Sequence, residues 1–478
     1  MMFADPAEVL DFVAAEGIQM VDLKIVDLPG RWHHVTLPAS QLTAEKLGYG
    51  VGIDTSSYPG YKSVEAGDMR VVADLASGMV DPFCQARTLS FICNIVGPIS
   101  GAPYPRDPRG VALRAEKYCS EVVGPGQAVF SPELEFYVFS NVQYLSEMNA
   151  AGYEVDSVEA GWNCGVAEAP NLGHKIPAHC GYHAIQPRDK LNDLRSAMLL
   201  AIEAAGIEGH YHHHEVGAPG QVEIEVGLGP LLHMADGVMK MKYLIRNIAD
   251  NAGMTATFMP KPMFGEAGNG MHVHQYIAQD GKSLFWDAEA PYANLSKLGL
   301  HWIGGLLKHA AALLALCSPS TNSYRRLVPG YEAPISCFFG LSNRTAAIRV
   351  PAYAVNEREN RIEFRPPDAT CNPYLCLAAM TMAGLDGVRN EIDPADHDFG
   401  PFDQDITKMA PEERARIAQL PTSLQEALAA LQADHEFLLE GGVFSRDVVE
   451  AWMKFKEDEV AAVNLRPHPH EYMLYYDL

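Results

Sequence analysis

Positive charge, paired cysteines and long hydrophobic runs are all scarce in this sequence of 478 residues. Its nine cysteines are scattered without a Cys-x-x-Cys pair, which predicts reduced, mostly buried thiols in a cytoplasmic protein. Lys and Arg number 36 against 60 Asp and Glu. The resulting net charge of -24 argues against nucleic acid and anionic membranes as partners, because both are polyanions. No basic segment precedes an apolar run in the first ten residues, so no signal peptide is expected.

The longest apolar stretch covers residues 298–317 and is interrupted by His301, Lys308 and His309. Its length would allow a membrane-spanning helix, but the polar interruptions and the pair Gly304-Gly305 favour a helix in a protein core. Hydrophobic residues make up 48% and charged residues 20% of the chain, as in ordinary globular proteins. The length predicts two domains, or one large domain with an appendage.

The hydrophobic periodicity predicts a small sheet-rich part followed by a larger part of mixed helices and strands. The small part is expected to end near the Gly- and Pro-rich segment 98–108. In the first part we expect a helix at 6–17 and strands at 20–26, 32–37, 69–74 and 88–95. In the second part we expect an irregular insertion at 141–176, an extended tail at 467–478, strands at 128–139, 255–259, 271–276, 341–350 and 360–365, and helices at 109–122, 193–205, 231–252, 375–387, 423–439 and 447–462.

The fourteen residues 212–225 contain three histidines and three carboxylates, divided by the turn signal Pro219-Gly220. Side chains alternate along a strand, so two short strands folded over this turn would bring Glu215 and Glu223 to one point. Paired carboxylates repel unless a cation lies between them, and hard cations such as Mg²⁺ prefer oxygen ligands. The alternative is a solvated hairpin with charged edges. Either interpretation depends on partners elsewhere in the chain.

Carboxylates and histidines also occur on other predicted strands. Glu133 and Glu135 lie on one face of an otherwise apolar strand, where burying them unpaired would be costly. His272 and His274 alternate onto one face, although such a pair is more often structural than a metal site.

Arginines accompany the carboxylates near the C-terminal end of the mixed part. Arg361, Glu363 and Arg365 share one face of a predicted strand. Such a face suits a ligand that holds both phosphate and metal, although an exposed ladder of ion pairs would give the same pattern. Five carboxylates and two histidines thus fall on short strands flanked by arginines: Glu133, Glu135, Glu215, Glu223, Glu363, His213 and His272. The acids fit two hard cations and the arginines fit a transferred phosphate, which indicates an ATP-dependent ligase or phosphotransferase with Mg²⁺ or Mn²⁺.

Ordered motifs along the whole chain resemble those of type I glutamine synthetases: Ser-Pro-Glu-Leu-Glu-Phe (131–136), His-His-Glu-Val-x-x-x-Gly-Gln-x-Glu (213–223), Gly-Met-His-Val-His (270–274), Arg-Leu-Val-Pro-Gly-Tyr-Glu-Ala-Pro (326–334), Asn-Arg-x-Ala-x-Ile-Arg (343–349) and Arg-Ile-Glu-Phe-Arg (361–365). The resemblance implies an α+β fold, with an N-terminal β-grasp domain at 1–105 and a catalytic domain at 106–478. The catalytic domain would contain a curved antiparallel sheet, helices and a helical tail. It also implies a cytoplasmic dodecamer of two stacked hexamers, in which the neighbouring subunit contributes the Asp54 loop to each active site.

The resemblance assigns roles to individual residues. One metal ion, Mg²⁺ or Mn²⁺, would be held by Glu135, Glu215 and Glu223, and a second by Glu133, His272 and Glu363. Glutamate would contact Gly268, Arg326, Glu332 and Arg365, and ATP would contact His213, His274, Arg344, Arg349 and Arg361. The ammonium pocket would be formed by Asp54, Ser57, Tyr182, Glu215 and Glu332. Asp54, Glu332 and Arg344 would be the catalytic residues.

The implied activity is ATP-dependent ligation of ammonia to the γ-carboxylate of L-glutamate through γ-glutamyl phosphate, without nucleic acid or membrane partners. One departure from the family pattern is the order Ala267-Gly268-Asn269-Gly270 where Asn-Gly-Ser-Gly is usual, and another is Tyr276 in place of a common serine. These departures keep open a γ-glutamyl-polyamine or γ-glutamyl-amine ligase of the same superfamily. Two further alternatives are an inactive structural relative and a zinc protein built on residues 210–214. Retention of all six metal ligands argues against the first, and the excess of carboxylates over imidazoles argues against the second.

Overall fold

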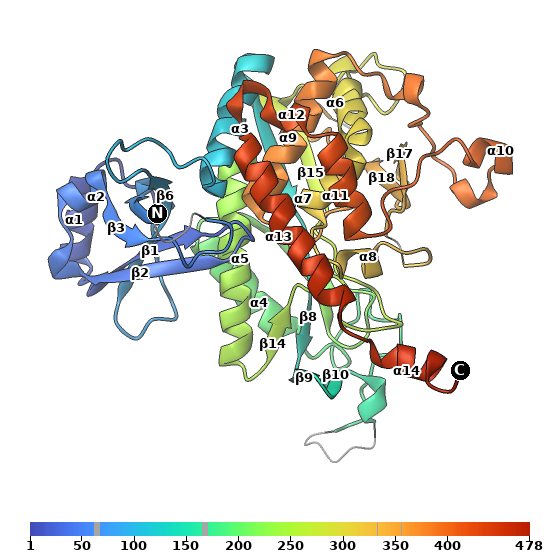
Figure 1. Ribbon diagram of the computed structural model, residues 1–478, viewed down its shortest axis with the longest axis horizontal. Helices are drawn as coiled ribbons and strands as arrows, with labels where there is room; N and C mark the ends of the chain where they lie inside the picture. Colours follow the sequence, from blue (N-terminus) through green and yellow to red (C-terminus); the bar gives the residue numbers. More distant parts are fainter. Residues whose placement is uncertain (62–66, 165–170, 332, 355) are drawn as a thin grey trace.

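The structure is a computed structural model that describes residues 1–61, 67–164, 171–331, 333–354 and 356–478. Figure 1 shows a smaller sheet-rich part, drawn in blue, beside a larger part in which helices surround the remaining strands. Each part has its own hydrophobic core, one centred on residues such as Val21 and Phe91 and the other on residues such as Phe130, Trp302 and Tyr374. The α+β class predicted from the sequence is confirmed.

The smaller part is a mixed sheet with strand order β2-β1-β6-β4-β3, in which β1 and β6 run parallel and β5 adds to the edge of β6. Helix α1 (Pro6–Ala15) begins where the side chain of Asp5 accepts hydrogen bonds from two main-chain amides of the first turn. The other elements are α2 (Ala44–Tyr49), β1 (Met20–Val26), β2 (Trp32–Pro38), β3 (Val51–Asp54), β4 (Asp68–Ala73), β5 (Met79–Val80) and β6 (Thr88–Val96). The four strands predicted here are therefore present, with β3 and β5 in addition.

A buried arginine joins the two parts. Arg109 lies in the first turn of α3 (Pro108–Val123) and is 1% exposed. Its guanidinium donates to both carboxylate oxygens of Asp236 in the larger part, at 3.0 and 2.8 Å, and to Asn94 and Asp74 in the smaller part, at 2.7 and 2.5 Å. Because Arg109 and Asp236 are buried and Asn94 and Asp74 are partly buried, these contacts fix how the smaller sheet sits on the larger part.

Apart from a separate two-stranded hairpin at residues 141–156, the strands of the larger part form two sheets. One has the order β11-β12-β8-β14 and the other the order β13-β7-β15-β19-β18-β17, with β16 paired to β15. Their bounds are β7 (Gln127–Pro132), β8 (Leu134–Phe139), β11 (Gly209–His214), β12 (Gln221–Val226), β13 (Gly229–Pro230), β14 (Thr255–Thr257), β15 (Val273–Gln279), β16 (Lys282–Ser283), β17 (Ser336–Leu341), β18 (Ala346–Val350) and β19 (Ile362–Phe364). The run predicted as one strand at 128–139 is therefore divided at Glu133, whose amide instead donates to the carbonyl of His272 at 2.9 Å. Glu133 thus lies where the two sheets meet, not on the face of one strand.

Helices pack around these sheets, and α9 is almost wholly buried among them (Figure 1). Two glycines allow α6 and α9 to touch, since a Cβ on Gly305 would lie 2.1 Å from the carbonyl oxygen of Ala383 and one on Gly387 would lie 2.0 Å from that of His301. The helix bounds are α4 (Asn192–Ala204), α5 (Leu231–Asn251), α6 (Lys297–Lys308), α7 (Ala310–Cys317), α8 (Ser323–Arg326), α9 (Pro373–Arg389), α10 (Pro411–Arg414), α11 (Leu424–Ala433), α12 (Glu436–Leu439), α13 (Arg446–Asn464) and α14 (Pro469–Tyr475).

Several local predictions differ from the structure. The segment predicted as an irregular insertion contains an exposed antiparallel hairpin, β9 (Asn141–Glu147) with β10 (Ala150–Asp156). The predicted extended tail forms helix α14, because His468 and Glu471 satisfy the free amides at its start in a capping box. The strand predicted at 341–350 is the end of β17 followed by β18, with Ser342 at a φ of 57° between them. The helix predicted at 423–439 is divided into α11 and α12.

The apolar stretch 298–317 forms α6 and α7, whose axes differ by 74°. Among the described residues, no single helix is long and apolar enough to cross a membrane, and this bent pair is the one combination that meets the criteria of length and composition. Most of its side chains, including Trp302 and Leu313, are buried against the rest of the fold, as predicted for a core helix.

Candidate active site

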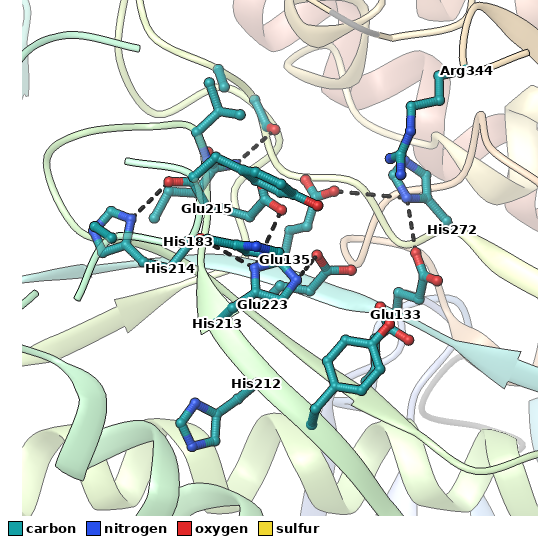
Figure 2. Close-up of a pocket in the computed structure, with 18 of the residues that line it drawn as sticks. Glu133, Glu135, His183, His212, His213, His214, Glu215, Glu223, His272 and Arg344 are labelled. Carbon is teal, nitrogen blue, oxygen red and sulfur yellow. Dashed lines mark hydrogen bonds and ion pairs between the residues drawn. The ribbon is translucent and has the colours of Figure 1, made fainter. Parts of the chain in front are cut away.

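A cavity of about 1200 Å³ opens where strands of the two sheets meet in the larger part. Its wall is dominated by carboxylates, histidines and arginines, shown as sticks in Figure 2. Most residues singled out from the sequence lie on this wall: Glu133, Glu135, Tyr182, His213, Glu215, Glu223, Gly268, His272, Arg326, Arg344, Arg349, Arg361, Glu363 and Arg365. These residues come from segments more than 200 positions apart in the sequence, so the fold brings together what the motifs only suggested.

The histidine- and glutamate-rich stretch forms the predicted hairpin on one side of the cavity. Strands β11 and β12 pair antiparallel with His213 opposite Glu223. Gly220 occupies the turn with a φ of 91°, and a Cβ there would lie 2.4 Å from the carbonyl oxygen of Val138, so only glycine fits. Strand β12 also pairs with β8 so that Glu223 lies opposite Glu135. The side chains of Glu215 and Glu223 also contact each other across the turn, so the prediction that the turn would bring these two carboxylates together is confirmed.

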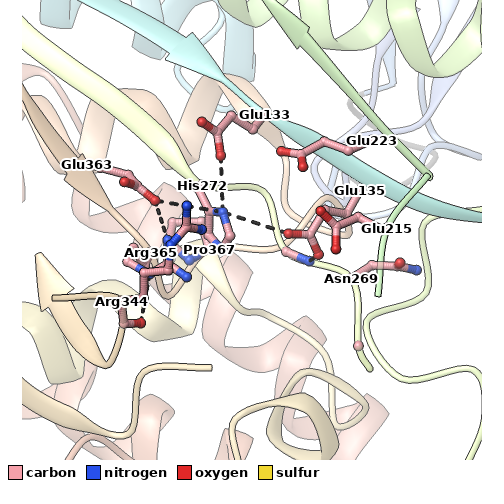
Figure 3. Close-up of polar contacts among 12 residues, drawn as sticks. Glu133, Glu135, Glu215, Glu223, Asn269, His272, Arg344, Glu363, Arg365 and Pro367 are labelled. Carbon is pink, nitrogen blue, oxygen red and sulfur yellow. Dashed lines mark hydrogen bonds and ion pairs between the residues drawn. The ribbon is translucent and has the colours of Figure 1, made fainter. Parts of the chain in front are cut away.

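Among the described residues, two groups of three side chains have the spacing of a metal site: Glu133, His272 and Glu363, and His213, Glu223 and Glu225. The ligand atoms of Glu133, His272 and Glu363 all lie within 4.8 Å of one another, and all three residues are buried. Nδ1 of His272 lies 3.1 Å from Glu133 Oε2 and 3.8 Å from Glu363 Oε1 (Figure 3). Two carboxylates and an imidazole suit a divalent cation that accepts both oxygen and nitrogen ligands.

Three further carboxylates converge beside this group. Burial and the charges of neighbouring carboxylates raise the pKa values of Glu215 and Glu223, that of Glu223 well above its usual range. Burial also raises the pKa of Glu135, although Arg326 opposes this change. Three carboxylates that share a buried site repel one another when ionised, and a hard cation between them would remove the repulsion. The donor set therefore fits a second divalent ion.

Three arginines of the wall, Arg326, Arg349 and Arg365, are buried and held by polar contacts. Glu363 forms ion pairs with both Arg349 and Arg365. Burial would raise the pKa of Glu363, but Arg365 and the neighbouring histidines outweigh burial and lower that pKa to about 2. Arg326 is 4% exposed, and its Nη1 donates to the carbonyl oxygen of Pro366 at 2.8 Å. Fixed guanidinium groups of this kind recognise carboxylate and phosphate oxygens.

In the loop 267–270, whose residue order is unusual, Gly268 and Asn269 have different roles. A Cβ on Gly268 would lie 2.9 Å from Arg326 Cγ and 2.5 Å from the carbonyl oxygen of Pro260, so the backbone approaches Arg326 closely. Asn269 is fully buried, and its amide nitrogen donates to the carbonyl oxygen of Met259 at 2.8 Å while its oxygen accepts from Gln221 at 3.1 Å. Asn269 therefore holds the loop in place, and Gly268 is the residue of this pair that faces the cavity.

Two groups near the hairpin were not assigned a role from the sequence. Glu159 and His214 are both fully buried, and His214 contacts Glu159 Oε2 through Nε2 at 3.0 Å and the carbonyl oxygen of Glu215 through Nδ1 at 2.7 Å. Glu225 lines the cavity and accepts a hydrogen bond from the hydroxyl of Tyr211. Burial and the charge of Glu133 raise the pKa of Glu225 to about 7. The alternation of Glu223 and Glu225 along β12 was the one sequence signal for the latter.

Three described residues that were singled out from the sequence, Asp54, Ser57 and His274, do not lie on the described wall of the cavity. Asp54 is exposed at the end of β3 in the smaller part, where its Oδ1 accepts from the amide of Ser56 at 2.8 Å, and Ser57 follows in the same loop. His274 is buried behind Glu133, with its Nε2 2.7 Å from Glu133 Oε1. Glu332 lies outside the described residues.

Comparisons with known proteins match the chain to glutamine synthetases over almost its whole length. The family model of the glutamine synthetase β-grasp domain matches residues 17–98, and that of the glutamine synthetase catalytic domain matches residues 105–475. The chain is 45% identical to glutamine synthetase of Microchaete diplosiphon over 473 residues, which is 99% of each chain. It is 44% identical to glutamine synthetase of Streptomyces coelicolor over 478 residues, which is all of both chains.

Two solved structures share the fold. Plasmodium falciparum glutamine synthetase superposes with a TM-score of 0.89 at 26% identity, covering 100% of this chain and 99% of that one. The ligand-free structure of GmaS superposes with a TM-score of 0.79 at 24% identity, covering 98% of this chain and 99% of that one.

Proposed function

Because this chain belongs to the glutamine synthetase family, we propose that the cavity of the larger part is the active site in which it joins ammonia to the γ-carboxylate of glutamate. The chain is a glutamate–ammonia ligase that uses ATP. The observation that carries the location of the site is that Glu133, His272 and Glu363, which have metal-ligand spacing, share one cavity with three further glutamates and with buried arginines. The three further glutamates, Glu135, Glu215 and Glu223, form the second group of ligands in this proposal. That combination serves phosphoryl transfer, where catalysis depends on positioning and charge.

We propose two divalent ions, Mg²⁺ or Mn²⁺, for these two groups of ligands. Glu133, His272 and Glu363 would hold one ion, since their ligand atoms already lie within 4.8 Å of one another. Glu135, Glu215 and Glu223 would hold the other, which would relieve the repulsion that raises the pKa values of Glu215 and Glu223. Bound divalent ions would neutralise phosphate charge and orient the reacting carboxylate.

Different residues would bind glutamate and ATP. Arg326, Arg365 and the backbone of Gly268 would hold glutamate, because the first two are fixed cations and the third exposes its main chain next to Arg326. The phosphates of ATP would contact Arg344, Arg349 and Arg361, with His213 nearby and His274 supporting from behind Glu133. Cations aimed at the transferred phosphoryl group stabilise the charge that develops on it.

The reaction then takes two steps. An oxygen of the γ-carboxylate attacks the terminal phosphorus of ATP and ADP leaves, giving γ-glutamyl phosphate. Ammonia attacks the γ-carbonyl carbon and phosphate leaves, giving glutamine. Ammonium must first lose a proton, so an anionic pocket is required, for which we propose Tyr182 and Glu215 of the cavity wall with Asp54, Ser57 and Glu332. Asp54, Glu332 and Arg344 would be the catalytic residues.

Asp54 and Ser57 would reach the pocket from a second copy of the chain. Both lie in the smaller part, away from the described cavity wall of their own chain. A dodecamer of two stacked hexamers would supply that neighbour, and we propose this assembly in the cytoplasm with domains at 1–105 and 106–478. A monomer would then lack part of its ammonium pocket.

The test is glutamate-dependent phosphate release from ATP and Mg²⁺, with ammonium, putrescine, spermidine or a small amine as the acceptor. We expect release with ammonium, and a loss of at least about a hundredfold in Asp54→Ala with little change in the KM for ATP. No phosphate release with ammonium, together with release in the presence of an amine, would identify a γ-glutamyl-amine ligase instead. Mixing the Asp54→Ala and Glu223→Ala variants before assembly should restore part of the activity. Some active sites would then combine an intact cavity wall from one subunit with an intact Asp54 loop from its neighbour.

A further inference from the structure

Three loops meet at one point of the cavity wall. Tyr331 and His179 line the cavity, the first in the segment between α8 and β17 and the second in the segment before α4. Lys261 and Glu266 belong to a third loop, which connects β14 to β15 and also carries Gly268. These four residues are called the junction below.

Lys261 contacts Tyr331 directly. Its ammonium nitrogen lies 3.7 Å from the centroid of the Tyr331 ring, well inside the range of about 6 Å over which a cation is attracted to an aromatic face. The same nitrogen donates to the carbonyl oxygen of Glu266. Burial lowers the pKa of Lys261, although the carboxylate of Glu266 opposes this change. A partly desolvated ammonium is attracted more strongly to a ring than one in water.

His179 completes the junction. Its ring centroid lies 6.3 Å from that of Tyr331, and its Nδ1 lies 3.5 Å from Glu266 Oε2. Glu266 itself is only 8% exposed, so its carboxylate faces the junction and not open water. The third loop is fixed in turn at Lys261, whose amide donates to Asn322 Oδ1 at 2.7 Å. The ring of Tyr331 therefore packs against Lys261, whose main chain is held by Asn322, and lies near His179, which contacts Glu266.

We propose that Lys261 is a positioning residue that holds Tyr331 in the cavity wall and thereby keeps water away from the activated intermediate. This inference rests on the proposed function, in which γ-glutamyl phosphate forms in the cavity. When water reaches that intermediate, it attacks, the acyl phosphate bond breaks, and glutamate and phosphate are released without glutamine. Lys261 is not on the described cavity wall, so it would act through Tyr331 and not by touching substrate.

The experiment measures glutamine formed per ATP consumed, using the full-length protein with saturating glutamate, ammonium and Mg²⁺. Lys261→Met keeps the length of the side chain without its charge, and Tyr331→Leu removes the ring. Lys261→Arg and Tyr331→Phe keep the cation and the ring. Lys117→Met is the matched control, because it removes a lysine whose side chain is 80% exposed on α3. Thermal unfolding of each variant reports whether it is folded.

We expect the glutamate-dependent ATP consumption that yields no glutamine to rise about five- to thirtyfold in Lys261→Met and in Tyr331→Leu, the factor that a half-buried cation–π contact is worth. The double variant should be no worse than either single variant, since both remove one contact. The variants Lys261→Arg, Tyr331→Phe and Lys117→Met should form as much glutamine per ATP consumed as the wild type.

Unchanged coupling in folded Lys261→Met, or additive losses in the double variant, would overturn the inference. A wild-type protein that makes no glutamine at all would instead overturn the proposed function, so the two failures are distinguishable. A loss of coupling in Lys261→Met that Lys261→Arg shares would also count against the cation–π contact, because arginine supplies an equivalent cation.

Discussion

Replacing Glu159 should weaken metal binding although Glu159 is not a proposed ligand. A carbonyl and a carboxylate can only accept hydrogen bonds, so both ring nitrogens of His214 donate, one to Glu215 and the other to Glu159. Burial lowers the pKa of His214, but the hydrogen bond and charge of Glu159 outweigh it and raise that pKa. Glu159 thus favours the charged form of His214, and the hydrogen bond from His214 Nδ1 to the carbonyl oxygen of Glu215 fixes the main chain there.

The magnitude follows from the burial of the pair. Both side chains are fully buried, and Glu159 Oε1 also accepts from the amide of Lys190 at 2.5 Å. Glu159→Ala would leave His214 without its charged partner in a dry site, which costs about 3–5 kcal/mol of unfolding free energy. Glu159→Gln keeps an acceptor of the same shape and exchanges a charged hydrogen bond for a neutral one, so about 1 kcal/mol is expected. Because an outer hydrogen bond orients a ligand, Mn²⁺ affinity should fall about 10- to 100-fold in Glu159→Ala.

Isothermal titration with Mn²⁺ and urea unfolding of the same samples would measure both effects. Glu208→Ala is the control, because it removes a carboxylate whose side chain is 75% exposed just before β11. Wild-type Mn²⁺ affinity in folded Glu159→Ala would refute the argument that His214 carries the effect to Glu215. Equal damage from Glu159→Gln and Glu159→Ala would show that shape, and not charge, is what matters at this position.

Two further predictions concern charge in the core. Burial lowers the pKa of His309, but Asp386 and Asp434, at 2.9 and 2.7 Å, outweigh it and raise that pKa. The charged ring therefore stabilises the fold fully below about pH 6.5, and this contribution is lost as the pH rises through the higher folded pKa. At pH 6, His309→Gln should lose about 2 kcal/mol in urea unfolding, discounted because Asp434 is partly exposed, and the deficit should shrink by pH 9; a constant deficit would contradict this reasoning. Chelation with EDTA should lower the wild-type melting temperature, and less so in Glu363→Gln, which lacks one proposed ligand; equal shifts in calorimetry would argue against Glu363 as a ligand.

Local patterns fixed many elements of the fold. Alternation and a Pro-Gly turn predicted the hairpin of β11 and β12, because a turn and two amphipathic strands are properties of adjacent residues. The same reasoning failed at Glu133, where a continuous apolar run is shared between two sheets. It also failed at 467–478, where the cap formed by His468 and Glu471 outweighed the two prolines.

The candidate site shows the same division. The sequence alone singled out most of the carboxylates and arginines that line the cavity, since such side chains are too costly to place on buried strands without a ligand or partner. Tertiary structure alone decided that Glu223 lies opposite Glu135, that Glu159 supports His214 from 55 residues away, and that Lys261 lies under Tyr331. These contacts join residues distant in the chain, and no local periodicity encodes them, because they depend on how separate elements pack.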